Sequence, residues 1–270
     1  MGKNKVDLFF CGDSFTWGEE LQGPEQNHNR REKERFSGVV SDILGKTHVN
    51  ISCSGTSNDW IVKNTIEWFE RGNSCDVAII QFSQERRWMW YDKQGKQYHM
   101  PAKWMERKGT YSYTNSEKGK AQKAYMTHVI SDHIAHDNYW KNMFMVRNYL
   151  KDKCKVIHLS LMEAPRGLPN FWYEAVGNID ILELKPLLKS RDDVRRQKSV
   201  LKPEFHNWIM SDNKYGKWEN SNYCANLDDS DILDNNMNKR FSGAHPSAKG
   251  HILISETILD RHSDLVQEYS

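Results

Sequence analysis

The feature that most constrains the fold is an alternation of short apolar runs with segments of helical spacing. The clearest run is 77–82 (VAIIQF), whose length and composition are typical of a strand buried on both faces. Strands are also expected at 6–11, 48–53, 156–161 and 179–184, and helices at 36–44, 57–69, about 120–151, about 200–210 and after Ser247. Such alternation predicts βαβ units. The expected fold is therefore three-layer α/β/α, with a central parallel sheet of about five strands.

Two stretches interrupt this rhythm, one after the third strand and one after the fifth. The first, about 86–118, begins RRWMWYDKQGKQYHMP, which predicts two aromatic-rich strands around a Lys-Gln-Gly-Lys turn. The second, about 185–242, is polar and rich in Asn and Asp. No internal repeat divides the chain, so we expect one domain over 1–270 with these two insertions.

Charge and composition exclude several classes of protein. Lys and Arg number 38 against 36 Asp and Glu, so neither a nucleic-acid surface nor an anionic-membrane surface is expected. The mixed run 30–35 (RREKER) predicts an exposed start of the first helix. No stretch reaches the roughly 18 apolar residues of a membrane span, and the N-terminus lacks a signal-peptide pattern, so a cytoplasmic location is expected. Five widely spaced cysteines without a Cys-x-x-Cys pair predict no zinc site, and no cofactor is expected.

A serine stands where a parallel sheet places its functional residues. Ser14 follows the first strand by three residues, and ligands of such sheets bind at the carboxyl ends of the strands. Its surroundings, Gly-Asp-Ser-Phe-Thr-Trp-Gly, lack the Gly-x-Ser-x-Gly spacing of the α/β-hydrolase elbow. That fold is therefore disfavoured.

Several spaced blocks resemble the SGNH, or GDSL, hydrolase family. Gly12-Asp13-Ser14 matches its first block, Gly55 follows the second strand as the family's oxyanion glycine does, and 245–251 (HPSAKGH) matches the His-Pro-x-x-x-Gly-His ending of the last block. The resemblance implies a flavodoxin-like SGNH fold and a serine esterase. It also implies roles: Ser14 as nucleophile, His245 as its general base, and the backbone N–H groups of Ser14 and Gly55 as oxyanion donors.

Two positions depart from the family pattern. The third block normally supplies an Asn that donates to the oxyanion, but Glu85 stands nearest that position, and an ionised carboxylate cannot donate. Either Gln84 or Asn58 supplies the amide, or the hole has two donors. Ser242 stands where the family has an Asp three residues before the histidine. The acid then comes from elsewhere, or a backbone carbonyl serves in a dyad; the nearby candidates are Asp228, Asp229, Asp231 and Asp234.

The expected activity is hydrolysis of an ester that joins an acetyl or another short acyl group to a carbohydrate or small molecule. Arg86 and Arg87 follow the third strand and can reach a substrate carboxylate or phosphate, or one of them pairs with Glu85. Aromatic residues of the first insertion can stack on a sugar ring, or they pack a hairpin against the domain: Trp88, Trp90, Tyr91, Tyr98 and Trp104. The alternative is a catalytically silent binding or assembly module on the same sheet.

A metal site is the weakest of the alternatives. His128, Asp132 and His136 lie four residues apart and would share one helix face, with His133 and Asp137 beside them. A solvated helix face with ordinary histidines explains the same pattern, so no metal is expected. The oligomeric state, the acyl group and the acceptor are left open by the sequence.

Overall fold

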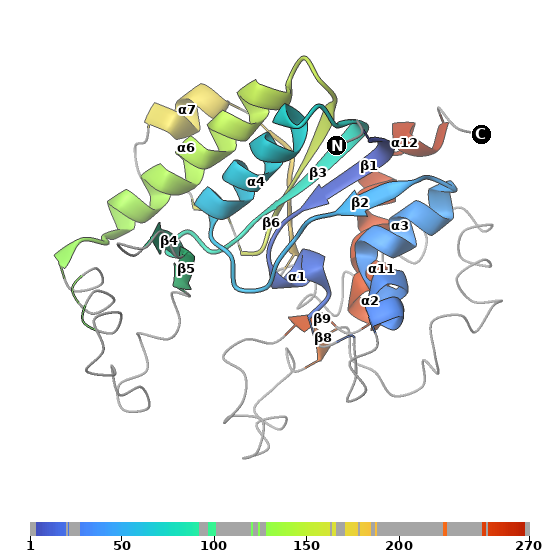
Figure 1. The fold of residues 1–270 in the computed structure, drawn as a ribbon, viewed down its shortest axis with the longest axis horizontal. Helices are drawn as coiled ribbons and strands as arrows, with labels where there is room; N and C mark the ends of the chain where they lie inside the picture. The colour runs from blue at the N-terminus through green and yellow to red at the C-terminus, as the bar shows by residue number, and fades with distance from the viewer. Residues whose placement is uncertain are drawn as a thin grey trace.

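The centre of the molecule is a five-stranded parallel sheet with the order β2-β1-β3-β6-β7 (Figure 1). Its strands are β1 (Lys5–Cys11), β2 (His48–Asn50), β3 (Ser74–Phe82), β6 (Lys155–Ser160) and β7 (Ile181–Glu183). The structure is a computed structural model that describes residues 4–19, 21, 28–91, 97–100, 120, 124, 128–162, 164–165, 171–177, 179–184, 187, 224–225, 245–246 and 248–267. When only these five strands are numbered in chain order, the order across the sheet is 2-1-3-4-5, which is that of flavodoxin-like folds.

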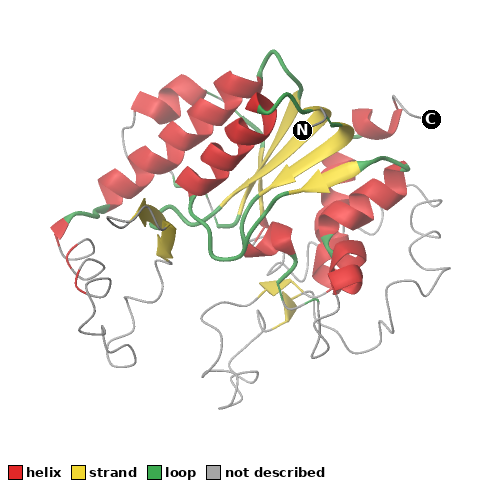
Figure 2. Ribbon diagram, viewed as in Figure 1, coloured by secondary structure: helices red, strands yellow, loops and turns green. Residues whose placement is uncertain are grey.

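Helices cover both faces of this sheet, which confirms the three-layer prediction (Figure 2). On one face lie α3 (Phe36–Leu44) and α11 (Ala248–Arg261); on the other lie α4 (Asn58–Glu70) and α6 (Asp132–Leu150), with α7 (Phe171–Val176) packed on α6. The remaining helices are α1 (Ser14–Trp17), α2 (His28–Glu34) and α12 (Asp264–Gln267). The helices expected at 36–44 and 57–69 are therefore confirmed, and the one expected at 200–210 lies outside the described residues.

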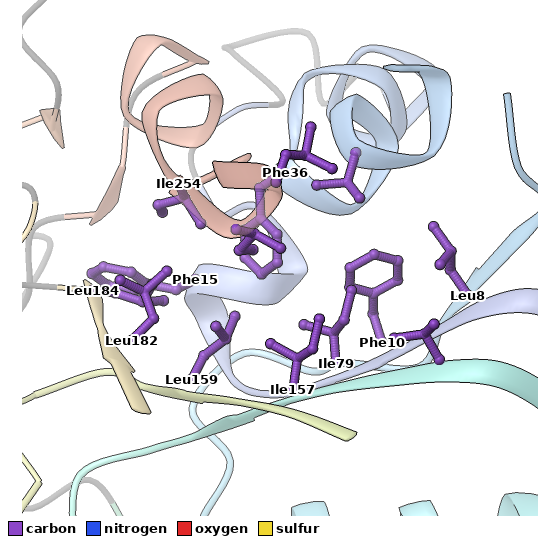
Figure 3. Close-up of a cluster of buried hydrophobic side chains, with 14 of the residues drawn as sticks. Leu8, Phe10, Phe15, Phe36, Ile79, Ile157, Leu159, Leu182, Leu184 and Ile254 are labelled. Atoms are coloured by element: carbon purple, nitrogen blue, oxygen red, sulfur yellow. The ribbon is translucent and has the colours of Figure 1, made fainter. Parts of the chain in front are cut away.

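The strands are apolar on both sides because each side meets a helical layer. Along β1, Leu8 and Phe10 point into one cluster while Phe9 and Cys11 point into the other. Figure 3 shows the first cluster, in which Phe10 lies between the sheet and the helix that carries Phe36. Each fully buried Leu, Ile or Phe contributes about 1.5–3 kcal/mol.

The helix expected after Ser247, α11, packs as its sequence predicts, with one adjustment. Ile254, Ile258 and Leu259 join the cluster against the sheet, and Leu253 joins them. Ile252 is buried outside that cluster. The expected cap, Ser247, lies outside the described residues.

Two short antiparallel pairs stand outside the main sheet. β4 (Trp88–Tyr91) pairs with β5 (Gln97–Met100), so the hairpin predicted after the third strand is confirmed. β8 (Cys224–Ala225) pairs with β9 (His245–Pro246) below α1 in Figure 1. The remainder of both predicted insertions, 101–118 and most of 185–242, lies largely outside the described residues.

The prediction that 30–35 forms an exposed start of the first helix is wrong. Residues 30–34 belong to a separate helix, α2, and Arg35 is the N-cap of α3; Arg31, Glu34 and Arg35 are buried. The guanidinium carbon of Arg31 lies 3.7 Å from the centroid of the Trp17 ring. Arginine buries its aliphatic stem and stacks its planar head on aromatic rings, so a charged run can form part of a packed interface.

The long helix expected over about 120–151 is interrupted. Residue 128 is helical, but 129–131 are not, and the Ser131 side chain accepts a hydrogen bond from Ile134 N as the N-cap of α6. A Ser that caps a new helix competes with helix continuation. His128 is consequently not on the helix that carries Asp132 and His136.

Two absences are established for the described residues alone. None of their helices is both long and apolar enough to cross a membrane. They also contain no group of three His, Cys, Asp or Glu side chains arranged to hold a metal ion. The cytoplasmic location expected from the sequence stays a prediction.

Candidate active site

The candidate site lies where the strand order of the sheet reverses. β1 and β3 are neighbours, and the chain leaves them towards opposite sides of the sheet. In flavodoxin-like sheets this switch point is where ligands bind, at the carboxyl ends of the strands. Gly12 to Ser14 follow β1 directly, and Ser83 to Arg87 follow β3.

Ser14 is the first residue of the short helix α1. Asp13 is its N-cap, with an extended backbone and a carboxylate Oδ1 that accepts from Phe15 N at 3.0 Å. The turn closes through Gly18 N, which donates to Ser14 O at 3.1 Å. Ser14 is 2% exposed, so its position is set by packing and not by a free loop.

Close packing against β3 holds this turn in place. Gln81 Oε1 accepts from Asp13 N at 3.1 Å and from Thr16 Oγ1 at 2.8 Å. A Cβ on Gly12 would lie 2.4 Å from Thr16 Oγ1 and 2.7 Å from Gln81 Oε1, so only glycine fits there. Gln81, which is fully buried, was missed by the sequence analysis because it sits inside the most apolar strand.

His245 reaches the same turn from the other end of the chain. It pairs with Ala225 in the β8–β9 ribbon, and its ring centroid lies 5.8 Å from that of Phe15, the residue after Ser14. The two rings are inclined by 57°. The structure therefore brings the sequence-predicted histidine to the helix that begins with the sequence-predicted serine.

The loop after β2 carries Gly55 and is fastened to the end of β1. Thr56 Oγ1 donates to Cys53 O at 3.0 Å, and Cys53 N donates to Gly12 O at 3.3 Å. Gly55 has φ +74°, and a Cβ there would meet no atom within 4 Å. Within the described part of the chain, the N–H groups of Ser14 and Gly55 have no hydrogen-bond acceptor. Their oxyanion roles stay predictions.

Of the two amides considered as a third donor, Asn58 is the one whose side chain is hydrogen-bonded to the residue after β3. Its Oδ1 accepts from Ser83 N at 2.7 Å, and its Nδ2 donates to Ser83 O at 3.3 Å. An amide nitrogen has two N–H groups, so one remains for another acceptor. Gln84 is half-buried, and its backbone O accepts from Arg87 N at 3.1 Å. The oxyanion roles of both stay predictions.

Arg87 belongs to the site and Arg86 points away from it. Arg87 Nη1 donates to Asp13 Oδ2 at 2.8 Å. Arg86 instead forms an ion pair with Asp132 at the start of α6, and its substrate-binding role stays a prediction. The sequence gives no signal that separates these adjacent arginines, because the difference lies in partners that are distant along the chain.

Glu85, the residue nearest the family's Asn position, also turns towards α6. Its Oε1 lies 3.7 Å from His136 Nε2. Burial raises the pKa of the Glu85 carboxyl, and the nearby His136 and Arg86 act in the opposite direction. The third block thus divides in two: Glu85 and Arg86 contact α6, whereas Ser83 and Arg87 contact Asp13.

The aromatic hairpin begins close to these strand ends. Trp88 is half-buried at the start of β4, and β4 packs on α4. The side chains of Tyr98 and Trp104 lie outside the description, so a five-residue platform stays a prediction.

Fold and strand ends together define a flavodoxin-like α/β protein with a buried serine at its switch point. No family model and no curated protein matches the chain. Its similar solved structures include a catalytic mutant of an acetylxylan esterase from Geobacillus stearothermophilus, at 14% identity over 96% of this chain and 94% of that one, with a TM-score of 0.40. Another is an acetyl xylan esterase from Butyrivibrio proteoclasticus, at 14% identity over 61% of this chain and 49% of that one, with a TM-score of 0.35.

Proposed function

We propose that this protein is a serine ester hydrolase that removes an acetyl or another short acyl group through an acyl-enzyme on Ser14. The observation that carries the proposal is the meeting of distant segments at α1, where His245 packs against Phe15 and Ser14 begins the helix. A serine hydroxyl becomes an effective nucleophile when an adjacent imidazole accepts its proton.

The proposed reaction has two halves. Ser14 Oγ attacks the ester carbonyl while His245 accepts the hydroxyl proton; the C–O bond to the alcohol then breaks, and the alcohol leaves with that proton. Water next attacks the acyl-serine, with His245 again accepting a proton, and the carboxylic acid departs as Ser14 is restored. In both halves the N–H groups of Ser14 and Gly55 donate to the oxyanion, and the free N–H of Asn58 is the proposed third donor.

We propose a carbohydrate or small-molecule ester as substrate, with no nucleic-acid or membrane partner. The aromatic hairpin that begins at Trp88, after the segment 83–87 that follows β3, supports a sugar ring over a lipid chain. The acid partner of His245 stays a prediction, since Ser242, Asp228, Asp229, Asp231 and Asp234 all lie outside the described residues.

The test is hydrolysis of p-nitrophenyl acetate by the wild type and by Ser14→Ala. We expect Ser14→Ala to lower kcat by about a thousandfold or more. Ser74→Ala is the matched control, because Ser74 is exposed at the opposite end of the sheet, at the start of β3. Equal rates in wild type and Ser14→Ala would remove Ser14 from the mechanism and favour the silent binding module.

A further inference from the structure

The carboxylate of Asp13 accepts three hydrogen bonds at the strand ends. It is fully buried, and its donors are Phe15 N of α1 at 3.0 Å and two groups of the segment after β3, Ser83 Oγ at 2.7 Å and Arg87 Nη1 at 2.8 Å. A buried carboxylate is stable as an anion only when it is paired and hydrogen-bonded. Arg87 supplies the opposite charge, with its side chain 13% exposed.

Arg87 also contacts the loop that carries Gly55. The same Nη1 donates to Thr56 O at 3.4 Å, and Thr56 is the residue after Gly55. The loop that carries Arg87 is closed by a backbone hydrogen bond, in which Arg87 N donates to Gln84 O at 3.1 Å. One guanidinium therefore joins the chain segments that follow β1, β2 and β3.

We infer that Arg87 is a positioning residue of the esterase site, which sets the spacing between the N–H groups of Ser14 and Gly55. This inference rests on the proposed function. Ser14 is attached to Asp13 and Gly55 to Thr56, so the two oxyanion donors are each one residue from a group that Arg87 holds. The segment after β3 therefore holds two donors in place through Arg87, and we call this link the brace. The SGNH resemblance implies instead that this block supplies a donor side chain itself.

The consequence is specific to the transition state. Oxyanion donors act when they lie within about 2.7–3.1 Å of the position that the oxyanion will occupy. A small change in the separation of two donors weakens that contact while it leaves ground-state binding of the ester nearly unchanged. Loss of the brace should therefore lower kcat more than it raises KM.

Lysine separates this role from simple charge compensation. Lys keeps a positive charge near Asp13, but its ammonium lacks the rigid, planar donor geometry of the guanidinium. We expect Arg87→Lys to lower kcat for p-nitrophenyl acetate by about tenfold or more, with KM within about twofold of wild type and a melting temperature within a few degrees. Arg71→Lys is the matched control, since Arg71 is 70% exposed and pairs with Glu67 on the surface of α4.

The outcomes distinguish failure of the brace from failure of the proposed function. An active wild type, an inactive Ser14→Ala and an Arg87→Lys with wild-type kcat would overturn the brace alone. A fall in kcat that matches the fall in folded fraction would also overturn it. An unreactive wild type would overturn both. If Arg87→Lys does not fold, Asp13→Asn with Arg87→Gln removes both buried charges; a folded double variant with wild-type kcat would overturn the inference, and reduced kcat at unchanged KM would support it.

Discussion

The ring of His245 lies 5.8 Å from the ring of Phe15, centroid to centroid, and Phe15 is covalently next to Ser14. This packing places an imidazole from the C-terminal part of the chain beside the first turn of α1. Phe15 itself is buried in the core cluster that also contains Leu253 and Ile254 of α11. Phe15, the neighbour of the candidate nucleophile, thus contacts both this hydrophobic core and the ring of the candidate base.

Gly55→Ala should lower kcat by about tenfold or more. Gly55 has φ +74°, which alanine adopts only with strain, so the substitution should shift the N–H that is proposed to bind the oxyanion. Gly45→Ala is a close control: Gly45 has φ 62°, and a Cβ at either position meets no atom within 4 Å. We expect both variants to lose a similar free energy of unfolding, about 1–2 kcal/mol. Equal kcat in the two variants, measured with p-nitrophenyl acetate, would contradict a role for Gly55.

Ser57→Ala should lower both the free energy of unfolding and kcat, because Ser57 caps the helix that begins with the proposed oxyanion donor Asn58. Ser57 caps α4 through a hydrogen bond from Trp60 N to its Oγ at 3.4 Å, and α4 begins with Asn58. Loss of an N-cap costs about 1 kcal/mol. Ser131→Ala removes the equivalent cap of α6, where Ile134 N donates at 3.3 Å, and should cost the same in urea unfolding while kcat stays unchanged. An equal fall in kcat in Ser131→Ala and Ser57→Ala would contradict a specific role of the α4 cap in positioning Asn58.

Stability should fall as the pH drops below about 6.5, because two histidines are buried in the neutral form. Burial lowers the pKa of His158 to about 4 and that of His251 to about 3. The unfolded chain therefore binds protons that the folded chain does not, between about pH 6.5 and these lower pKa values. Each such group costs about 1.4 kcal/mol of unfolding free energy for every pH unit of descent in that window.

His158→Leu isolates one of these two contributions. The variant should lose less unfolding free energy than wild type between about pH 7 and about pH 5, by roughly 2 kcal/mol. Any change in packing that is independent of pH cancels in this difference, which urea titrations at the two pH values would measure. An identical loss in both proteins would show that His158 becomes protonated in the folded state.

The sheet and most of its covering helices could be predicted because their signals are local. Residues 77–82 are apolar except for Gln81, as expected of a strand between two helical layers, and the helix expected at 36–44 has those bounds in the structure. The break at 129–131 was hidden because apolar spacing continues across it, and only the capping Ser131 marks it.

The candidate site was harder to predict wherever the position of a side chain depends on a contact that is distant along the chain. Ser14, Gly55 and His245 stand in motifs, so their neighbourhood could be expected from the sequence. The buried Arg31 and the ion pair of Arg87 with Asp13 could not, since a charged residue looks the same in sequence whether it faces water or a distant carboxylate.

The account stands most directly on whether His245 activates Ser14. Reaction with a fluorophosphonate probe, followed by mass spectrometry of the peptides, measures both the modified residue and its rate. We expect wild-type protein to be modified at Ser14, and His245→Gln to react at least about a hundredfold more slowly while it remains folded. Modification at another residue, no modification at all, or an undiminished rate in His245→Gln would contradict the account.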